Sequence, residues 1–455
     1  MRSHNKSSKR RFIAKSLIFL LVLAILGGVW FINKLMPVIT GYPAKYLCSA
    51  IFTSERKQAD VENLDLHFSF IKYVTNKVNY KERSVTSTFL WGKSKAIYRD
   101  GFGATLLNQS SDEQKLRAIK FPESIHPIYN PDTTLWPLGE IVPPIHPTEK
   151  LKNLKEQVIE KDAYGGNIFA FVILHKGLPV VEGYKSGFNS KTRLLGWSMA
   201  KSFTNTLAGT MVQKGLIDER KPTGLTAWEN DERKNITLDD LMRMESGLQW
   251  NEGYGSRTDV TSMLYAERDF AQYAFSKPKE QKPGDKWLYS SGSTNIVNYV
   301  MRQQFDNDDA YYKYSYQALF NKIGMSRAIL EVDPTGTLVG SSYIYASARD
   351  YARYALLHLQ NGEFNGQQIL PTDWIKKITT PTKDSNGIYG SCFWLNKSKY
   401  LKDVPTDAYS CNGHDGQRIF IIPSLDLAVV ILGYSPKPNN VIDYNSLLKD
   451  VIDSI

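Results

Sequence analysis

The chain has few of the residues that build metal centres and disulfide frameworks. It holds three cysteines, Cys48, Cys392 and Cys411, and seven scattered histidines in 455 residues. Neither His-Glu-x-x-His nor a glycine-rich phosphate loop occurs, so no familiar zinc or nucleotide motif is present. We predict no metal and no organic cofactor. Cys392 and Cys411 are the pair closest in sequence, but three cysteines without a spacing pattern favour free, buried thiols.

The net charge outside the N-terminus is small. Six of the net +10 charges fall in the first 15 residues, which contain no acidic residue, and residues 16–455 keep only +4. Such a small surplus gives no support to nucleic-acid binding. We therefore predict no nucleic-acid partner, and the sequence makes no prediction of the oligomeric state.

One long hydrophobic run follows the basic tail. Residues 16–32 contain no charged side chain and are near the minimum length for a membrane span. Positive charge before the run predicts that the tail stays in the cytoplasm and the body is exported. A cleaved signal peptide is the competing interpretation, but no convincing small-x-small cleavage site follows. We predict a single-pass anchor in a bacterial cytoplasmic (inner) membrane, with the body on the periplasmic or extracytoplasmic side.

The pattern along the chain predicts four parts. Residues 1–15 form the basic cytoplasmic tail, and residues 16–34 form the transmembrane anchor. Residues 35–149 combine a linker, expected up to about residue 60, with a strand-rich and then proline-rich segment. Residues 150–455 form the main domain.

The main domain is expected to combine helices with an antiparallel sheet. Two hairpin patterns, over residues 168–184 and 418–432, stand near its two ends. Helical patterns lie between and around them, so we predict an α/β (α+β) fold with a helical insertion. Helices are expected near 151–161, 198–214, 236–242, 295–302, 345–360, 373–380 and 442–455. Outside the domain, residues 66–71 look like a strand.

Ser198 and Lys201 stand three residues apart at the start of an amphipathic pattern. Neighbours at i and i+3 share one face of a helix, so the amine can meet the hydroxyl. A neutral lysine amine can take the serine proton and so activate a nucleophile without histidine. Ser-x-x-Lys occurs six times in the chain, and chance explains any one pair until other motifs agree.

Two later segments supply further candidates. Residues 283–293 form a polar, glycine-bearing loop with Tyr289 at its turn, although Tyr289 is one of 26 tyrosines and could be an ordinary half-buried ring. Residues 412–417 precede a strand, and a glycine there lets a strand edge approach a ligand closely. The alternative for this second segment is a tight turn leading into a hairpin.

The ordered set of these motifs resembles a known family. Ser198-Met-Ala-Lys201, Tyr289-Ser-Ser291 and His414-Asp-Gly416 are separated by gaps of 91 and 125 residues. The order is similar to that of class C-type serine β-lactamases and penicillin-binding-protein-like hydrolases, and it is closest in motif to 6-aminohexanoate-dimer hydrolase-like and esterase members. The resemblance covers about residues 150–455 and implies a β-lactamase/transpeptidase-like fold.

The resemblance also implies roles. Ser198 would be the acylated nucleophile, Lys201 its base, and Tyr289 the group that passes the proton to the leaving group. Backbone N–H groups of Ser198 and Gln417 would form the oxyanion hole. The candidate oxyanion and substrate contacts are Gln417, His414, Gly416 and Ser291.

Two departures from the family pattern shape the functional prediction. The third motif begins with His414 instead of lysine, and the second ends with Ser291 instead of asparagine. Both favour an esterase or amidase acting on a small-molecule ester or amide through an acyl-enzyme. His414 could bind substrate or merely close the turn.

Three alternatives stand beside this prediction. One is a β-lactamase or D,D-peptidase acting on β-lactams or peptidoglycan. Another is an α/β-hydrolase, because residues 196–200 are one residue away from Gly-x-Ser-x-Gly. The last, from another class, is a catalytically inactive penicillin-binding-like binding or sensor module.

Overall fold

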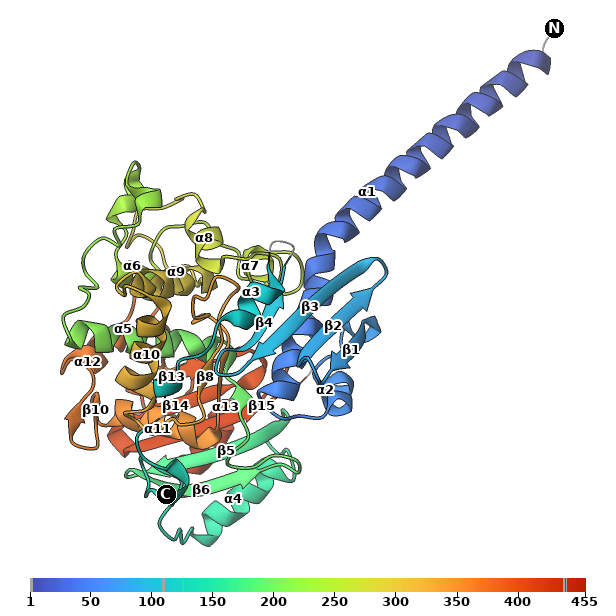
Figure 1. The fold of residues 1–455 in the computed structure, drawn as a ribbon. Helices are drawn as coiled ribbons and strands as arrows, with labels where there is room; N and C mark the ends of the chain where they lie inside the picture. The colour runs from blue at the N-terminus through green and yellow to red at the C-terminus, as the bar shows by residue number, and fades with distance from the viewer. Residues whose placement is uncertain (1–2, 109–110, 126, 437, 439) are drawn as a thin grey trace.

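A six-stranded antiparallel sheet forms the centre of the main domain in the computed structural model (Figure 1). The structure describes residues 3–108, 111–125, 127–436, 438 and 440–455. Arg2 of the predicted basic tail therefore lies outside the described residues. The strands, in their order across the sheet, are β12 (Trp394–Leu395), β13 (Tyr409–Asn412), β14 (Arg418–Ile422), β15 (Leu427–Gly433), β5 (Ile168–His175) and β6 (Leu178–Tyr184).

The two predicted hairpins are adjacent in this sheet. Strand β15 pairs with β5, so the beginning and the end of the domain meet at its centre, as the sequence predicts. Side chains of β5 alternate between two cores: Phe171 and Ile173 pack on one face, whereas Val172 and Leu174 pack on the other. This two-residue period of an extended chain explains why all four positions are apolar in a strand buried on both sides.

Helices cover both faces of the sheet. One layer contains α4 (Glu149–Ile159) and α13 (Tyr444–Ile452). The other contains α5 (Ala200–Gln213), α9 (Ser291–Arg302) and α11 (Ala348–Leu359). The remaining helices of the main domain are α6 (Leu238–Met242), α7 (Asp259–Tyr265), α8 (Phe270–Phe275), α10 (Asp308–Ser315) and α12 (Trp374–Ile378).

Short strands complete the domain. Strands β7 (Leu194–Leu195), β9 (Ile344–Ala346) and β8 (Ile329–Leu330) form a small antiparallel sheet, and β7 leads directly into the Ser198 segment. Strands β10 (Glu363–Phe364) and β11 (Gln367–Gln368) form a separate hairpin. The helix predicted from residue 345 begins later, at Ala348, because β9 occupies the first positions and Ser347 caps the helix.

The first helix extends well beyond the predicted anchor. Helix α1 (Ser3–Phe52) projects from the body in Figure 1, and its apolar side chains between Phe12 and Phe31 are exposed. From Met36 onward the same helix packs into the domain, where Leu47 and Cys48 are fully buried. The prediction of a linker from residue 35 to about 60 is therefore wrong. Residues 35–52 are the largely buried second half of one continuous helix, and α2 (Gln58–Leu64) begins after a short turn.

A four-stranded sheet wraps this buried half. Its strands are β1 (Thr75–Asn79), β2 (Ser84–Phe89), β3 (Gly92–Arg99) and β4 (Gly103–Leu107), with α2 (Gln58–Leu64) and α3 (Glu113–Ala118) beside them. Residues 66–71, expected as a strand, form a turn instead. The described proline-rich residues form short turns of helix at Glu123–Ile125 and Pro131–Thr133, together with an isolated bridge between Leu135 and Ile141.

A buried ion pair ties these N-terminal elements to the main domain. Lys45 of α1 contacts Glu331, which also accepts hydrogen bonds from Ser49 Oγ at 2.9 Å and from the Ala104 amide at 2.7 Å. Burial raises the pKa of the Glu331 carboxyl, and Lys45 opposes that rise. Helix α1, strand β4 and the loop after β8 are thus held by one carboxylate.

Candidate active site

Ser198 lies in a tight helical turn that leads directly into α5. The turn spans Trp197–Met199, and Trp197 has a left-handed φ of 49°. This conformation is strained for a bulky side chain, and the strain is balanced by the packing of its ring. The Trp197 ring stacks on Tyr42 and Tyr46 of α1 at centroid distances of 6.4 and 6.0 Å. Ser198 itself stays partly exposed.

Lys201, in the first turn of α5, is buried and contacts Ser198. Its Nζ lies 3.2 Å from Ser198 Oγ, 2.9 Å from Ser291 Oγ and 3.0 Å from the Ser341 carbonyl oxygen. The spacing in sequence predicts the first contact, because both residues belong to one helical turn. The other two contacts come from distant segments, and they orient the amine toward the serine hydroxyl.

Tyr289 approaches the same pair from the loop before α9. The Lys201 amine lies 4.8 Å from the centroid of its ring. Burial raises the pKa of the Tyr289 phenol, the Lys201 charge lowers it, the Glu252 charge raises it, and hydrogen bonding to Ser198 and Lys201 lowers it. The phenol is therefore a protonated group within reach of both the candidate nucleophile and its candidate base.

Ser291 connects Lys201 to a carboxylate that the sequence analysis missed. The fully buried Ser291 hydroxyl donates to Glu252 Oε1 at 2.5 Å, and the Ser291 amide donates to Glu252 Oε2 at 2.9 Å. Trp250 Nε1 and the Tyr254 hydroxyl also donate to this carboxylate, at 2.6 and 3.1 Å. Glu252 lies in a loop without periodic pattern, so no sequence signal identified it.

His414 lies between Trp197 and Tyr254 rather than among these contacts. It opens a short helical turn, His414–Gly416, and its Nε2 lies 3.2 Å from Asp415 Oδ1. Its ring stacks on Tyr254 at 5.0 Å and meets the edge of Trp197 at 5.8 Å. The side chain is 46% exposed and lies beside Trp197, the residue before Ser198, so both roles considered for His414 remain predictions.

The turn that carries Gly416 and Gln417 lies against the segment before Ser198. A Cβ on Gly413 would clash with the carbonyl oxygen of Gly196, so glycine permits this close approach. Gly416 has a φ of 92°, a left-handed conformation that favours glycine. A Cβ at this position would meet Ser435 and not the Ser198 segment, so the glycine is needed for the turn itself. The Gln417 amide side chain bonds the carbonyls of Asp415 and Gly433, at 3.1 and 2.6 Å, and therefore points away from Ser198.

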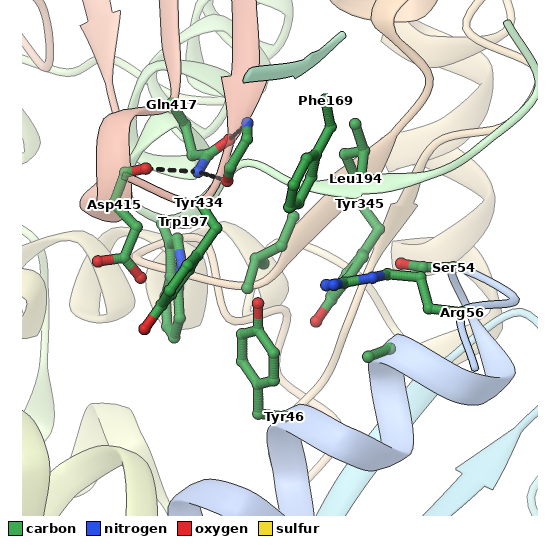
Figure 2. Close-up of a pocket in the computed structure, with 13 residues that line it drawn as sticks. Tyr46, Ser54, Arg56, Phe169, Leu194, Trp197, Tyr345, Asp415, Gln417 and Tyr434 are labelled. Carbon is green, nitrogen blue, oxygen red and sulfur yellow. Dashed lines mark hydrogen bonds between the residues drawn. The ribbon is translucent and has the colours of Figure 1, made fainter. Parts of the chain in front are cut away.

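A cavity lies next to Trp197 but is distinct from the Ser198 site. Figure 2 shows it enclosed by Tyr46 and Arg56 on one side and by Asp415, Gln417 and Tyr434 on the other. Its lining includes none of Ser198, Lys201 and Tyr289. The Gln417 side chain helps to form this cavity, which leaves only the backbone of Gln417 as a candidate oxyanion donor.

With this geometry in view, comparison with known proteins identifies the family. The family model described as Beta-lactamase matches residues 157–450, which is more than half of the chain. The chain therefore belongs to the Beta-lactamase family. The predicted relationship, the predicted fold class and the predicted enzyme class, a β-lactamase-related serine hydrolase, are confirmed.

Individual relatives are distant in sequence. A 6-aminohexanoate-dimer hydrolase from Paenarthrobacter ureafaciens is 21% identical over 299 residues, which cover 59% of this chain and 73% of that protein. Among solved structures, a putative 6-aminohexanoate-dimer hydrolase from Bacillus anthracis has a TM-score of 0.54 at 22% identity, covering 71% of this chain and 88% of its own. A family VIII carboxylesterase has a TM-score of 0.54 at 17% identity, covering 69% and 99%. At this identity, the structural likeness supports the fold.

Proposed function

We propose that this protein is a membrane-anchored serine hydrolase that cleaves an ester or amide through an acyl-enzyme on Ser198. The observation that carries the proposal is the convergence of three polar groups from separate segments. Lys201 Nζ lies 3.2 Å from the Ser198 hydroxyl and 4.8 Å from the centre of the Tyr289 ring. A protein that only binds a ligand has no need of a buried amine and a phenol at one serine hydroxyl.

Acylation begins with the neutral form of Lys201. Its amine takes the Ser198 proton while Oγ attacks the substrate carbonyl carbon, and the carbonyl oxygen becomes an oxyanion. Backbone N–H groups of Ser198 and Gln417 stabilise that oxyanion. The intermediate then expels an alcohol or amine, which receives its proton from the Tyr289 phenol as the phenol is reprotonated from Lys201. Ser198 is left as an acyl ester.

Deacylation runs the same proton path with water. Water attacks the acyl carbonyl carbon and gives its proton to the Tyr289–Lys201 pair. The ester bond to Ser198 breaks, its oxygen regains a proton, and the carboxylic acid product leaves. No metal or organic cofactor enters either half of this reaction.

Glu252 acts as a positioning residue through Ser291. When Lys201 takes the serine proton it becomes a cation, and the carboxylate reaches that cation through one hydroxyl. An aspartate stabilises the imidazolium of a Ser-His-Asp triad by the same physics. The negative charge also raises the pKa of the Tyr289 phenol and so keeps its proton available.

The anchor is assigned to the exposed part of α1. The residues from Phe12 to Phe31 expose large apolar side chains, and the most hydrophobic 18-residue window of the helix has none of its residues buried in the protein. Exposing so many apolar side chains to water is unfavourable, and this segment of the helix is long enough to span a bilayer. By the positive-inside rule, the basic residues before it support an N-terminus in the cytoplasm and a hydrolase domain outside a bacterial cytoplasmic membrane.

A substrate screen on the full chain in detergent tests the proposed activity. Short p-nitrophenyl esters, linear amides and a cephalosporin are offered to the wild type and to Ser198→Ala. Hydrolysis of esters or amides by the wild type alone supports the proposal. Hydrolysis of the cephalosporin alone would replace it with a β-lactamase, and no turnover of any of these substrates would oppose it.

A further inference from the structure

The hairpin that joins β2 and β3 lies beside the point where α1 leaves the domain (Figure 1). The Trp91 indole N–H donates to Asn33 Oδ1 of α1 at 3.3 Å, and Gly92 packs against Met36. Phe31 is 58% exposed, whereas Met36 is 5% exposed. The hairpin tip therefore lies at the level where the helix changes from an exposed apolar rod to a buried element.

Large apolar side chains are exposed at this same end of the four-stranded sheet. Leu90 and Trp91 at the hairpin tip are 68% and 53% exposed. Phe70 and Tyr73, just before β1, are 60% and 64% exposed, and the Phe70 ring lies 6.4 Å from that of Phe89. The pairing of Thr75 with Thr88 brings the two groups together. Clustered exposed aromatics of this kind mark an interaction surface.

The charged side chains next to these residues along the chain are lysines. Lys34, Lys72 and Lys93 are exposed, and the Lys72 amine lies 5.1 Å from the centre of the Tyr73 ring. Residues 66–79 and 83–99 contain no aspartate or glutamate. The surface thus combines aromatic rings with lysines, which is the composition found where proteins meet anionic lipid head groups.

We propose that this surface, formed by Phe70, Lys72, Tyr73, Leu90, Trp91 and Lys93, rests on the anionic head groups of the membrane that α1 spans. The inference rests on the proposed anchoring of α1. No flexible linker separates the apolar part of the helix from the domain, so the surface follows the helix directly to the bilayer. Trp91 and Tyr73 occupy the interface, and the lysines face the lipid phosphates.

Docking holds the candidate active site near the membrane. Tyr42 follows Lys34 by eight residues, which is about 12 Å along a helix axis. The Tyr42 ring stacks on Trp197, next to the nucleophile, and meets the edge of Phe68 near the docking surface. The nucleophile is therefore kept at a fixed short height above the lipid, within reach of an ester or amide carried by a membrane-bound molecule.

Site-directed spin labelling of the full chain tests the docking. The three native cysteines are buried, so Leu90→Cys, Leu216→Cys and Leu23→Cys can each carry a nitroxide. Leu216, 42% exposed after the end of α5, is the matched control, and Leu23 reports insertion of α1. The probe membrane is a vesicle of phosphatidylcholine with one third phosphatidylglycerol, and the measured quantity is collision with a water-soluble nickel complex.

The expected result is a several-fold loss of nickel collisions at position 90 on moving from detergent to vesicles, with no change at position 216. Equal accessibility at 90 and 216 in vesicles, with position 23 protected, would overturn the docking and leave the anchor intact. An accessible label at position 23 would instead show that the anchor itself fails. Equal nickel collisions at position 90 in a neutral detergent and in vesicles would also overturn the proposal, because the detergent offers no anionic head groups.

Charge reversal tests the choice of anionic lipid. Lys72→Glu with Lys93→Glu should restore nickel collisions at position 90, and Lys376→Glu on α12, an exposed lysine of the main domain, should not. In vesicles of phosphatidylcholine alone, position 90 of the chain that keeps Lys72 and Lys93 should be less protected from the nickel complex. If nickel collisions at position 90 stay equally low after charge reversal and in uncharged vesicles, the assignment of anionic head groups is contradicted.

Discussion

The amine of Lys201 and the carboxylate of Glu252 are joined by a single hydroxyl group, that of Ser291. The hydroxyl accepts from Lys201 Nζ at 2.9 Å and donates to Glu252 Oε1 at 2.5 Å. This chain of hydrogen bonds gives the serine–lysine pair a third member. It also explains why the serine at the end of the second motif is fully buried and bonded on both sides.

Replacing the carboxylate tests this relationship. Glu252→Gln keeps the shape but removes the charge that raises the pKa of Tyr289, so that pKa should fall. Because the phenol must be protonated to act as an acid, the alkaline limb of kcat/KM against pH should move to lower pH. We expect kcat to fall about tenfold.

The matched control for this experiment is Tyr254→Phe. It removes one hydrogen bond to Glu252 but keeps the carboxylate charge, so the alkaline limb should stay in place. A pH profile of Glu252→Gln identical to that of the wild type would show that Glu252 supports the loop only.

Removing the base should stop acylation. Lys201→Met keeps much of the side-chain volume but has no amine to take the Ser198 proton, so acylation should slow by about 10³-fold or more. The measurement is the burst of p-nitrophenol from an activated ester, with circular dichroism to verify the fold. Lys214→Met, at the exposed end of the same helix, is the control and should keep the burst. A normal burst from Lys201→Met would remove this lysine from the mechanism.

Removing the phenol should slow both half-reactions. Tyr289→Phe keeps the ring but loses the proton donor, and turnover should fall by about 10²–10⁴-fold. Tyr389→Phe is a suitable control, because its buried ring packs 5.9 Å from that of Tyr289. Burial raises the pKa of Tyr289 above its ordinary value near 10. The wild type should therefore keep its activity up to about pH 10 and lose it only beyond that.

Much of this site could be predicted from sequence because its first pair is local. Ser198 and Lys201 need only one helical turn to meet. The central strands β5, β14 and β15 are short continuous apolar runs, which is the pattern of strands buried on both faces. Tyr289 lies in a segment that the ordered motifs pointed to. Its position beside Lys201 depends on packing between α5 and α9, which no local pattern encodes.

Local sequence patterns do not predict other features of the site. Glu252 reaches Ser291 from an irregular loop, and its side chain differs in no way from that of any exposed glutamate until the fold is formed. The left-handed conformation of Trp197 is likewise imposed by contacts with α1. Pro37 and Pro43 would ordinarily interrupt a helix, yet α1 continues through both, and its second half is largely buried against the domain.

The buried pair between α1 and the main domain should carry a large share of stability. Lys45→Met leaves Glu331 buried without its counter-charge, and the free energy of unfolding should fall by about 3–5 kcal/mol. Thermal unfolding in one detergent provides the comparison. Lys161→Met breaks an ion pair whose side chains are about half exposed, and it should change stability little. Equal effects of the two variants would show that the N-terminal elements are not held by Glu331.

Covalent labelling with a fluorophosphonate probe tests the central claim most directly. The probe reacts with an activated serine hydroxyl, so the wild type should be labelled stoichiometrically, with the modified peptide containing Ser198. Ser198→Ala should lose the label, whereas Ser276→Ala, which alters another Ser-x-x-Lys pair, should keep it. Folded wild-type protein that takes up no label, or a label that survives in Ser198→Ala, would contradict the assignment of Ser198 as the nucleophile.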